Sequence, residues 1–365
     1  MKYIYWIVLF GFLIYHTDLL YGDYTMICTF YDMKNEIAHV YSVSNEGDIS
    51  LSYTLSLPHH GSPENIVFSP DGRWGMIGCC FDFDIILGVN TKGKIYVLDS
   101  IPGDYWVAAA ISPDSKIGVY GDRLNSLRFY QNYTYEIVPS DNPPLCAVYL
   151  DFSSLNNRLY GRSTPINSEI ISEYTLLPDG RTTATGAMVN ISPSFGNEDL
   201  RISPDGKTCI ILSSGSYIIT VLNIFPSGGF SIKEQFNPIY NGYSLGTLND
   251  IAFTPDSKYA IISHLGPYNI VSFRINNDSS LTMVDGLDLP EYLGEIMNIT
   301  SDGKFVITRD ISYGGTTFFV VRVHDDGTLE YLPDKTYFTS YGNVSDIAFV
   351  PPRKTEANPS WQMYH

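Results

Sequence analysis

A short segment recurs along most of this chain, and this repetition constrains the fold more than any other feature. Each copy places an apolar run before a Pro-Asp-Gly type turn and a second apolar run after it. In such a turn Pro fixes φ near its own preferred value, Asp bonds nearby backbone amides, and Gly adopts the left-handed conformation. The repeat therefore predicts a hairpin of two strands. The copies are ENIVFSPDGRW from Glu64, AAAISPDSK from Ala108, DLRISPDGK from Asp199, DIAFTPDSK from Asp250 and MNITSDGK from Met297.

The spacing of the turn aspartates identifies the repeating unit. Asp71 and Asp114 lie 43 residues apart, and the steps from Asp205 to Asp256 and on to Asp302 are 51 and 46 residues. The remaining interval of 91 residues has room for one degenerate unit, CAVYLDFSSLNNRLYGRS, which keeps strand, turn and strand but loses the turn signature. Periods of roughly 40 to 50 residues are typical of four-stranded propeller blades. No segment shows a helical period, and Val, Ile, Tyr and Phe favour strands.

The two ends of the repeat region predict how the ring closes. YTMICTFYD, from Tyr24, reads as a second strand with no first strand before it. VSDIAFVPP, from Val344, reads as a first strand with no second strand after it, and it resembles LNDIAFTPD from Leu248. We therefore expect the C-terminal strand to complete the N-terminal blade of an all-β, seven-bladed propeller, which protects its strand edges. The predicted organisation is a signal peptide over 1–22, the propeller over 23–350 and a tail over 351–365.

The N-terminus predicts export. An apolar run from Ile4 to Tyr15 follows a single Lys and is shorter than the roughly 18 to 20 residues that span a bilayer. It fits a secretory signal that ends near Gly22, although Leu20 is larger than usual at such a cleavage site, so an uncleaved anchor is the alternative. We expect a periplasmic or extracellular protein with no membrane span after cleavage.

The charge narrows the range of partners. The formal net charge is −17, whereas nucleic acids and anionic membranes require a basic surface. We therefore expect no nucleic-acid partner, and a cationic ligand or a divalent metal suits the chain better. The acidity also has a simpler interpretation, because it keeps an exported protein soluble. We expect a monomer that binds a small molecule or another protein.

The cysteines indicate neither a zinc site nor a disulfide framework. None of them forms a CxxC pair, and each lies in an apolar, strand-like context. Buried free thiols are the favoured interpretation, with a bridge from Cys28 to Cys79 or Cys80 as the alternative.

Three segments carry a family resemblance. FSPDGRW, SFRINNDSSLTMV and VRVHDDGTLEYL resemble the repeats of seven-bladed lactonase-type propellers, namely the 6-phosphogluconolactonase-like and YVTN-repeat families. The resemblance covers essentially the whole chain after the signal segment. It implies this fold, and it implies hydrolysis of a lactone as one activity. The related six-bladed gluconolactonases hold a divalent ion in the channel, which makes such an ion a hypothesis for this chain.

Candidate site residues come from the loops that enter the innermost strands, because these strands line the channel. The residues seven and six positions before the turn aspartate are rich in Asp, Glu and Asn. Their oxygens suit a hard cation such as Ca²⁺, although an Asp there also commonly caps its own loop. The predicted metal ligands are Glu64, Asn65, Asp199, Asn249, Asp250, Glu295 and Asp346.

Other residues point to the same mouth of the channel. Arg201 stands in a column of mostly small residues, where it could hold a substrate carboxylate or phosphate, or neutralise the neighbouring acids. His59 and His60, in LPHHGSPEN, lie in a loop where the resemblance suggests a His, as a general base or a metal ligand; the simpler interpretation is a pair of exposed loop residues with no such role. Tyr105 and Trp106 could stack on a ligand ring or pack between blades.

Three functions remain open on the sequence alone, the third being a structural, surface-attached protein, which only the resemblance to YVTN repeats supports. The first is an exported binding scaffold that uses the channel rim. The second is a lactonase-like hydrolase, for which no G-x-S-x-G, HExxH, P-loop or dinucleotide motif offers support. Whether the chain is an enzyme is not decided by its sequence.

Overall fold

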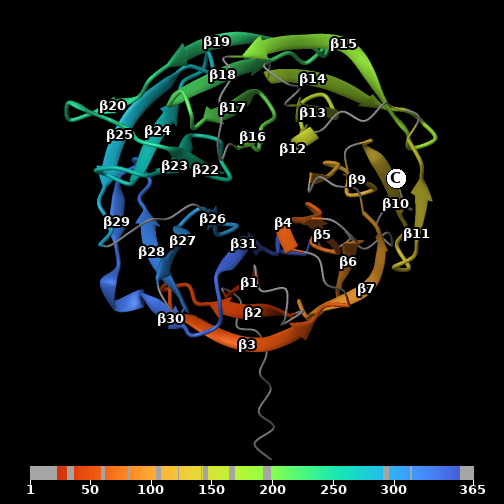
Figure 1. The fold of residues 1–365 in the computed structure, drawn as a ribbon, viewed down its shortest axis with the longest axis horizontal. Helices are drawn as coiled ribbons and strands as arrows, with labels where there is room; N and C mark the ends of the chain where they lie inside the picture. Colours follow the sequence, from red (N-terminus) through yellow and green to blue (C-terminus); the bar gives the residue numbers. More distant parts are fainter. Residues whose placement is uncertain are drawn as a thin grey trace, which may run out of the picture.

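The chain folds as a ring of seven radial sheets in a computed structural model (Figure 1). The structure describes residues 23–30, 37–58, 62–80, 83–103, 108–121, 123–140, 142, 147–163, 169–191, 199–290, 296–312 and 315–353. Within them the only helix is the short 3₁₀ turn η1, Pro333–Lys335, and no helix is long and apolar enough to cross a membrane. The predicted all-β propeller is confirmed.

Each blade is an antiparallel sheet whose first strand is innermost. Blade 1 contains β31 (Val344–Phe349), β1 (Tyr24–Phe30), β2 (Ile37–Val43) and β3 (Ile49–Ser56). Blade 2 contains β4 (Ser62–Phe68), β5 (Trp74–Cys80), β6 (Phe83–Val89) and β7 (Ile95–Pro102). Blade 3 contains β8 (Ala109–Ile111), β9 (Ile117–Tyr120), β10 (Asn125–Phe129) and β11 (Tyr135–Val138). Blade 4 contains β12 (Ala147–Ser153), β13 (Arg158–Ser163), β14 (Glu169–Leu176) and β15 (Thr182–Ile191).

The remaining blades follow the same plan with two additions. Blade 5 contains β16 (Leu200–Ile202), β17 (Thr208–Ser213), β18 (Ile218–Ile224) and β19 (Phe230–Phe236). A small hairpin, β20 (Ile239–Tyr240) and β21 (Tyr243–Ser244), precedes blade 6 and accounts for the long 51-residue spacing. Blade 6 contains β22 (Leu248–Phe253), β23 (Tyr259–His264), β24 (Ile270–Ile275) and β25 (Leu281–Leu287). Blade 7 contains β26 (Met297–Ile299), β27 (Phe305–Ser312), β28 (Gly315–Val323) and β29 (Leu329–Tyr331), and β30 (Tyr337–Thr339) also pairs with β28.

The ring closes as predicted. β31 pairs antiparallel with β1, with Met26 opposite Phe349 and Cys28 opposite Ile347. The last strand of the repeat thus supplies the innermost strand of the first blade, so the two ends of the propeller share one sheet.

The repeated turns have the predicted geometry. In blade 2 the Ser69 hydroxyl donates to Asp71 at 2.6 Å, and Gly72 has a φ of +67°. Ser115 and Ser257 adopt the same left-handed conformation, with φ of +61° and +58°. In the degenerate blade 4, Asn157 takes this conformation, with a φ of +55°.

The hydrophobic core lies between the blades. Seven clusters of buried apolar side chains fill the interfaces, one between each pair of neighbours, including the pair at the closure. Cys28 and Cys209 are buried free thiols within these layers, as expected, and Cys79 is buried there too. Each interface therefore has an apolar core, and buried polar contacts such as that of Glu173 with the Gly229 N–H add to it.

Candidate channel site

Two register positions on each innermost strand form the candidate site. Residues two apart in an extended segment share a face; the strand pairings align the later position in all seven blades and include the earlier one in four, the other three lying directly before their strands. We call the position nearer the strand start the upper ring and the one two residues later the lower ring. The upper ring contains Asn65, Ala108, Tyr149, Asp199, Asp250, Ile296 and Asp346. The lower ring contains Val67, Ala110, Asp151, Arg201, Ala252, Asn298 and Ala348.

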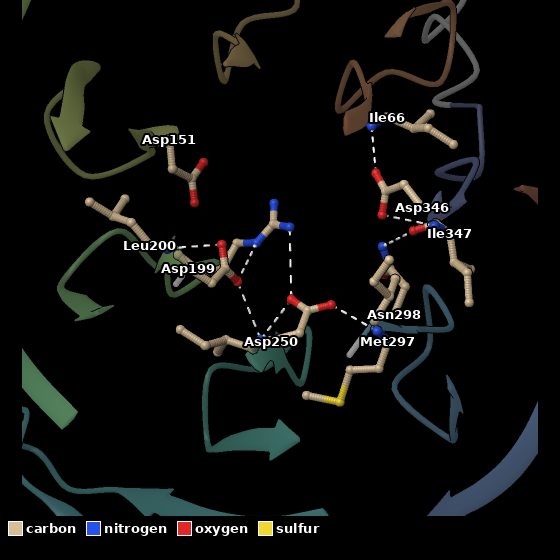
Figure 2. Close-up of polar contacts among 12 residues, drawn as sticks. Ile66, Asp151, Asp199, Leu200, Asp250, Met297, Asn298, Asp346 and Ile347 are labelled. Carbon is tan, nitrogen blue, oxygen red and sulfur yellow. Dashed lines mark hydrogen bonds and ion pairs between the residues drawn. The ribbon is translucent and has the colours of Figure 1, made fainter. Parts of the chain in front are cut away.

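The carboxyl groups of these rings connect neighbouring blades. Figure 2 shows Asp151, Asp199, Asp250 and Asp346 around the central channel. Asp250 accepts the amide N–H of its own neighbour Ile251 at 2.7 Å and that of Met297, in the next blade, at 2.7 Å. Both oxygens of the carboxyl are therefore used by backbone donors from two different sheets.

The other carboxyl groups repeat this double contact. Asp151 accepts from Phe152 and, across the interface, from Ile202; Asp199 accepts from Leu200 and Ile251; Asp346 accepts from Ile347 and Ile66.

Asn298 also connects two blades, but it donates a hydrogen bond across the interface where the carboxyl groups accept one. Its oxygen accepts the N–H of Ile299, and its amide nitrogen donates to the Ile347 carbonyl at 3.0 Å. These five side chains join blade 4 through blades 5, 6, 7 and 1 to blade 2, which covers five consecutive interfaces (Figure 2).

Arg201 lies among the acids rather than free in the channel. Its Nε donates to Asp199 Oδ2 at 3.1 Å, and its Nη2 is 4.0 Å from Asp250 Oδ1. Asp199 and Arg201 are two residues apart on one strand, so their side chains leave the same face. About a third of the Arg201 side chain is exposed, against 4% for Asp199. The guanidinium therefore neutralises the Asp199 and Asp250 carboxyls while one part of it meets channel water.

Burial changes the acidity of this cluster. It raises the pKa of Asp151 to about 6 and that of Asp346 to about 7, against the pull of Arg201 in both cases. It also raises the pKa of Asp250, and the adjacent Asp199 carboxyl adds to this effect. The pKa of Arg201 is raised chiefly by the charge of Asp199. Asp151 and Asp346 thus change protonation near neutral pH, the range in which general acids and bases work.

The residue just before the upper ring is displaced by a β-bulge in several blades. The pairing shifts between Pro63 and Asn65, which leaves Glu64 unpaired and exposed. It shifts in the same way between Leu248 and Asp250, and the extra residue there, Asn249, is buried. Bulges of this kind redirect a side chain, so Glu64 and Asn249 do not share the direction of the rings.

The predicted site residues therefore divide into three groups. Asp199, Asp250 and Arg201 come together, while Asn65 and Asp346 occupy the upper ring in other blades. Glu64 and Asn249 occupy the bulges. His59, His60, Tyr105, Trp106 and Glu295 lie outside the described residues.

The predicted divalent cation stays a prediction. Within the described part of the chain, no three His, Cys, Asp or Glu side chains come together as a metal-binding group. Each ring carboxyl also has both oxygens bonded to backbone N–H groups.

Sequence comparison of the turns missed two members of the lower ring. Asp151 lies in the degenerate blade, which has no turn aspartate to align. Matching Ser153 to Ser203 would have placed Asp151 opposite Arg201 in register. Asn298 lies four residues before the turn aspartate Asp302, as Arg201 lies four before Asp205, and this shared offset is the signal that identifies it. Arg162 and Arg309, both fully buried, occupy equivalent positions on the second strands of blades 4 and 7, and Arg162 lies over the Tyr149 ring.

Solved structures with the same architecture are numerous, although no family model matches the sequence. The periplasmic gluconolactonase PpgL of Pseudomonas aeruginosa aligns with a TM-score of 0.70 at 15% identity, over 90% of this chain and 99% of its own. A "putative 6-phosphogluconolactonase" from Bacteroides uniformis aligns with a TM-score of 0.70 at 17% identity, over 90% of this chain and 100% of its own. A Lactobacillus plantarum protein has a TM-score of 0.70 at 13% identity, over 90% of this chain and 99% of its own. This chain therefore has the fold of the lactonase-type seven-bladed propellers.

Proposed function

We propose that this protein is an exported propeller that binds a small, hydroxyl-rich ligand, neutral or cationic, in its channel. Four carboxyl groups around a single paired guanidinium carry the proposal. An anion entering this space meets an excess of negative charge as soon as the carboxyls ionise. Carboxylates accept hydrogen bonds readily from sugar hydroxyls and ammonium groups. Export is proposed from the apolar run between Ile4 and Tyr15.

A second function, hydrolysis of a sugar or acyl lactone, is supported by the fold and by one residue. Two of the structural neighbours are described as gluconolactonases or 6-phosphogluconolactonases. Asp346 has a pKa raised to about 7 and is partly open to the channel, so it can accept a proton from an attacking water. The acidic channel favours a neutral lactone over a phosphorylated one.

Acid release from a panel of lactones tests the hydrolase. Neutral sugar lactones, acyl lactones and a phosphorylated sugar lactone are compared with added Ca²⁺ and with EDTA. We expect turnover of neutral sugar lactones, with kcat lowered at least about a hundredfold in Asp346→Asn, which is the contribution typical of a general base. Asp250→Asn also tests the contribution of the group formed by Asp199, Asp250 and Arg201. Asp179→Asn, at an exposed turn, is the matched control.

The outcomes separate the two functions. Turnover lost in EDTA would support the predicted divalent ion. An absence of turnover in every condition would reject the hydrolase. Calorimetric titration of the same sugars and their amino derivatives then tests the binding function, which fails if only anionic ligands bind.

A further inference from the structure

The hairpin formed by β20 and β21 interrupts the repeat between blades 5 and 6. It forms a separate two-stranded sheet at the outer edge of the ring, beside β25, so it does not belong to the channel site (Figure 1). A two-stranded hairpin is at best marginally stable alone in water, and this one extends neither neighbouring blade. Insertions that a rigid scaffold presents in this way commonly carry binding residues.

The turn of this hairpin fixes the placement of two tyrosine rings. Asn241 and Gly242 have φ of +50° and +84°, which is the type I′ geometry that Asn-Gly favours in tight hairpins. Tyr240 and Tyr243 are therefore paired directly opposite each other. Directly opposite residues lie on one face of a hairpin, so the two tyrosines stand side by side.

Tyr240 fixes the hairpin to blade 6. Its ring lies so close to Gly286 of β25 that a Cβ added there would be 2.6 Å from Cε1. Its hydroxyl donates to Asp285 at 3.3 Å, and its ring is nearly perpendicular to that of Tyr268, with 4.8 Å between the centroids. Tyr240 is therefore the contact that holds the hairpin on the ring.

Tyr268 supports the hairpin from the turn between β23 and β24. Its backbone has a φ of +60°, a strained conformation for a bulky residue. Its N–H donates to the Asp288 carboxylate, and its carbonyl accepts a hydrogen bond from His264 Nε2 at 2.6 Å. Backbone strain that the surroundings hold in place clusters at sites that bind ligands.

Tyr243 is the ring of this group that remains exposed. Its centroid is 6.4 Å from that of Tyr268, with 54° between the two ring planes, and 55% of the residue is exposed. A ring held between a neighbouring ring and a tight turn loses little conformational entropy when a ligand stacks on it. Tyr243 is thus a preorganised stacking surface.

The side chains around Tyr243 suit an uncharged, hydroxyl-rich ligand. Residues 235–247 read QFNPIYNGYSLGT, with no charged side chain. Asn241 and Ser244 are exposed here, and amide and hydroxyl groups both donate and accept hydrogen bonds. The exposed Asp288 carboxylate adds an acceptor. A sugar ring has an apolar face that can stack on a tyrosine, and a border of hydroxyls that need both donors and acceptors.

The exposed apolar area is too small for a stable protein partner. Ile239 and Tyr243 are 63% and 55% exposed, which is less than about 300 Å² in total at roughly 150–250 Å² per large side chain. Each partner in a stable protein complex buries roughly 800 Å². A single sugar ring on Tyr243 fits the smaller area.

We propose that the β20–β21 hairpin is a carbohydrate-binding site, on which one ring of a neutral saccharide stacks against Tyr243. The hydroxyls of the saccharide bond to the exposed amide, hydroxyl and carboxylate groups around that ring, while Tyr240 and Tyr268 hold the hairpin in place. The site lies outside the channel and does not depend on the function proposed for the channel.

Native electrophoresis of the full chain through gels that contain a soluble polysaccharide tests the site. The probes are laminarin, dextran, hydroxyethyl cellulose, mannan and arabinoxylan, which are neutral. We expect at least one of them to retard the wild-type chain. For that polysaccharide Tyr243→Ala should raise the dissociation constant at least about fivefold because the stacking surface is lost, and Tyr243→Phe should stay within about twofold because the ring remains.

Tyr130→Ala is the matched control, because it removes a ring of similar exposure, 41%, from blade 3. It should leave the retardation unchanged. The thermal midpoint of Tyr243→Ala should stay close to that of the wild type, so that its loss of retardation reports on the site rather than on folding.

Several results would overturn the proposal. One is a wild-type chain that none of the five polysaccharides retards, and another is an equal loss in Tyr243→Ala and Tyr130→Ala. Retardation that Asp346→Asn abolishes and Tyr243→Ala leaves intact would place the saccharide in the channel instead. Self-association on gel filtration that Tyr243→Ala abolishes would mean that a second copy covers the hairpin.

Discussion

At the scale of single residues, the channel aspartates act as double hydrogen-bond acceptors. A carboxylate has two oxygens and no donor, so it can receive an amide N–H from its own strand and another from the neighbouring blade, as Asp250 does. An amide has one acceptor and one donor, and Asn298 accordingly reaches a carbonyl across the interface instead. The side-chain type thus decides whether the residue accepts or donates the hydrogen bond that crosses the interface.

Replacing Arg201 tests the charge balance of this arrangement. Arg201→Met leaves Asp199 and Asp250 without a countercharge, and we expect the free energy of unfolding at pH 8 to fall by about 2 kcal/mol. The expected loss of unfolding free energy is smaller than for a fully buried ion pair, because about a third of the Arg201 side chain is exposed to water. At pH 5 the loss should be smaller, because burial raises the pKa of Asp250 and this carboxyl is then more protonated than at pH 8. Chemical denaturation at both pH values measures the effect.

The control for this change is Arg128→Met, which breaks an exposed pair with Glu136. Its cost should stay below about 1 kcal/mol at either pH. Equal losses for the two variants at pH 8 would show that Arg201 does not neutralise the cluster.

At the scale of the secondary-structure elements, the repeated hairpins bond to one another around the ring. The Ser115 hydroxyl accepts the Asp71 N–H of the preceding blade at 3.1 Å, and the Ser257 hydroxyl accepts the Asp205 N–H at 2.9 Å. These are the two turns in which serine replaces the usual glycine. The left-handed φ that costs a serine some energy is thus offset by a bond between blades.

Two substitutions at Ser257 separate the strain from the bond. Ser257→Ala keeps the left-handed φ and loses the acceptor, so unfolding free energy should fall by about 1 kcal/mol. Ser257→Gly also loses the acceptor, but it relieves strain of about 1 kcal/mol, so its stability should stay close to wild type. Denaturant titration distinguishes them. If alanine were as stable as glycine, the contact would contribute nothing.

At the scale of the whole molecule, two sets of carboxyls respond to pH in opposite directions. In the turns, hydrogen bonds to Ser, Lys and backbone groups hold the pKa of Asp48, Asp256 and Asp278 below its usual value. In the channel, burial raises the pKa of Asp151 to about 6 and of Asp346 to about 7.

The two sets predict an optimum of stability at mildly acid pH. A lowered pKa contributes stability that is lost as the pH falls below about 4, where the turn carboxylates take up protons. A raised pKa makes the native state bind more protons than the unfolded chain between about pH 4 and 7, so stability falls as the pH rises through this range. Thermal unfolding across pH 3 to 9 should therefore show its highest midpoint between about pH 4 and 6.

Asp346→Asn gives this curve a specific test. The variant cannot titrate at this position, so the decline between about pH 4 and 7 should become shallower. Its midpoint at pH 5 should be lower than that of wild type because Ile66 loses its acceptor. An unchanged slope would mean that Asp346 does not titrate in this range.

The sequence by itself determined the architecture, because the information for it is local and repeated. The turn of Asp71 and Gly72 fixes a hairpin through φ preferences and short-range bonds, and the recurrence of such hairpins at roughly 40 to 50 residues is typical of a ring of four-stranded blades. The similarity of the segments at Leu248 and Val344 also predicted the closing strand. The same alignment predicted which columns would meet, including Asp199, Arg201 and Asp250.

Only the tertiary structure decided what those columns do. That Asp250 accepts the amide N–H of Met297 follows only from the packing of two different blades. The bulge that turns Glu64 away depends on the register with β5. Asp151 becomes part of the ring through its contact with Ile202, although its turn lacks the repeat signature. A bridge between blades and a shift in strand pairing each depend on two segments that are far apart in the sequence. The residue pattern of one segment does not show which atoms of the other segment it will contact.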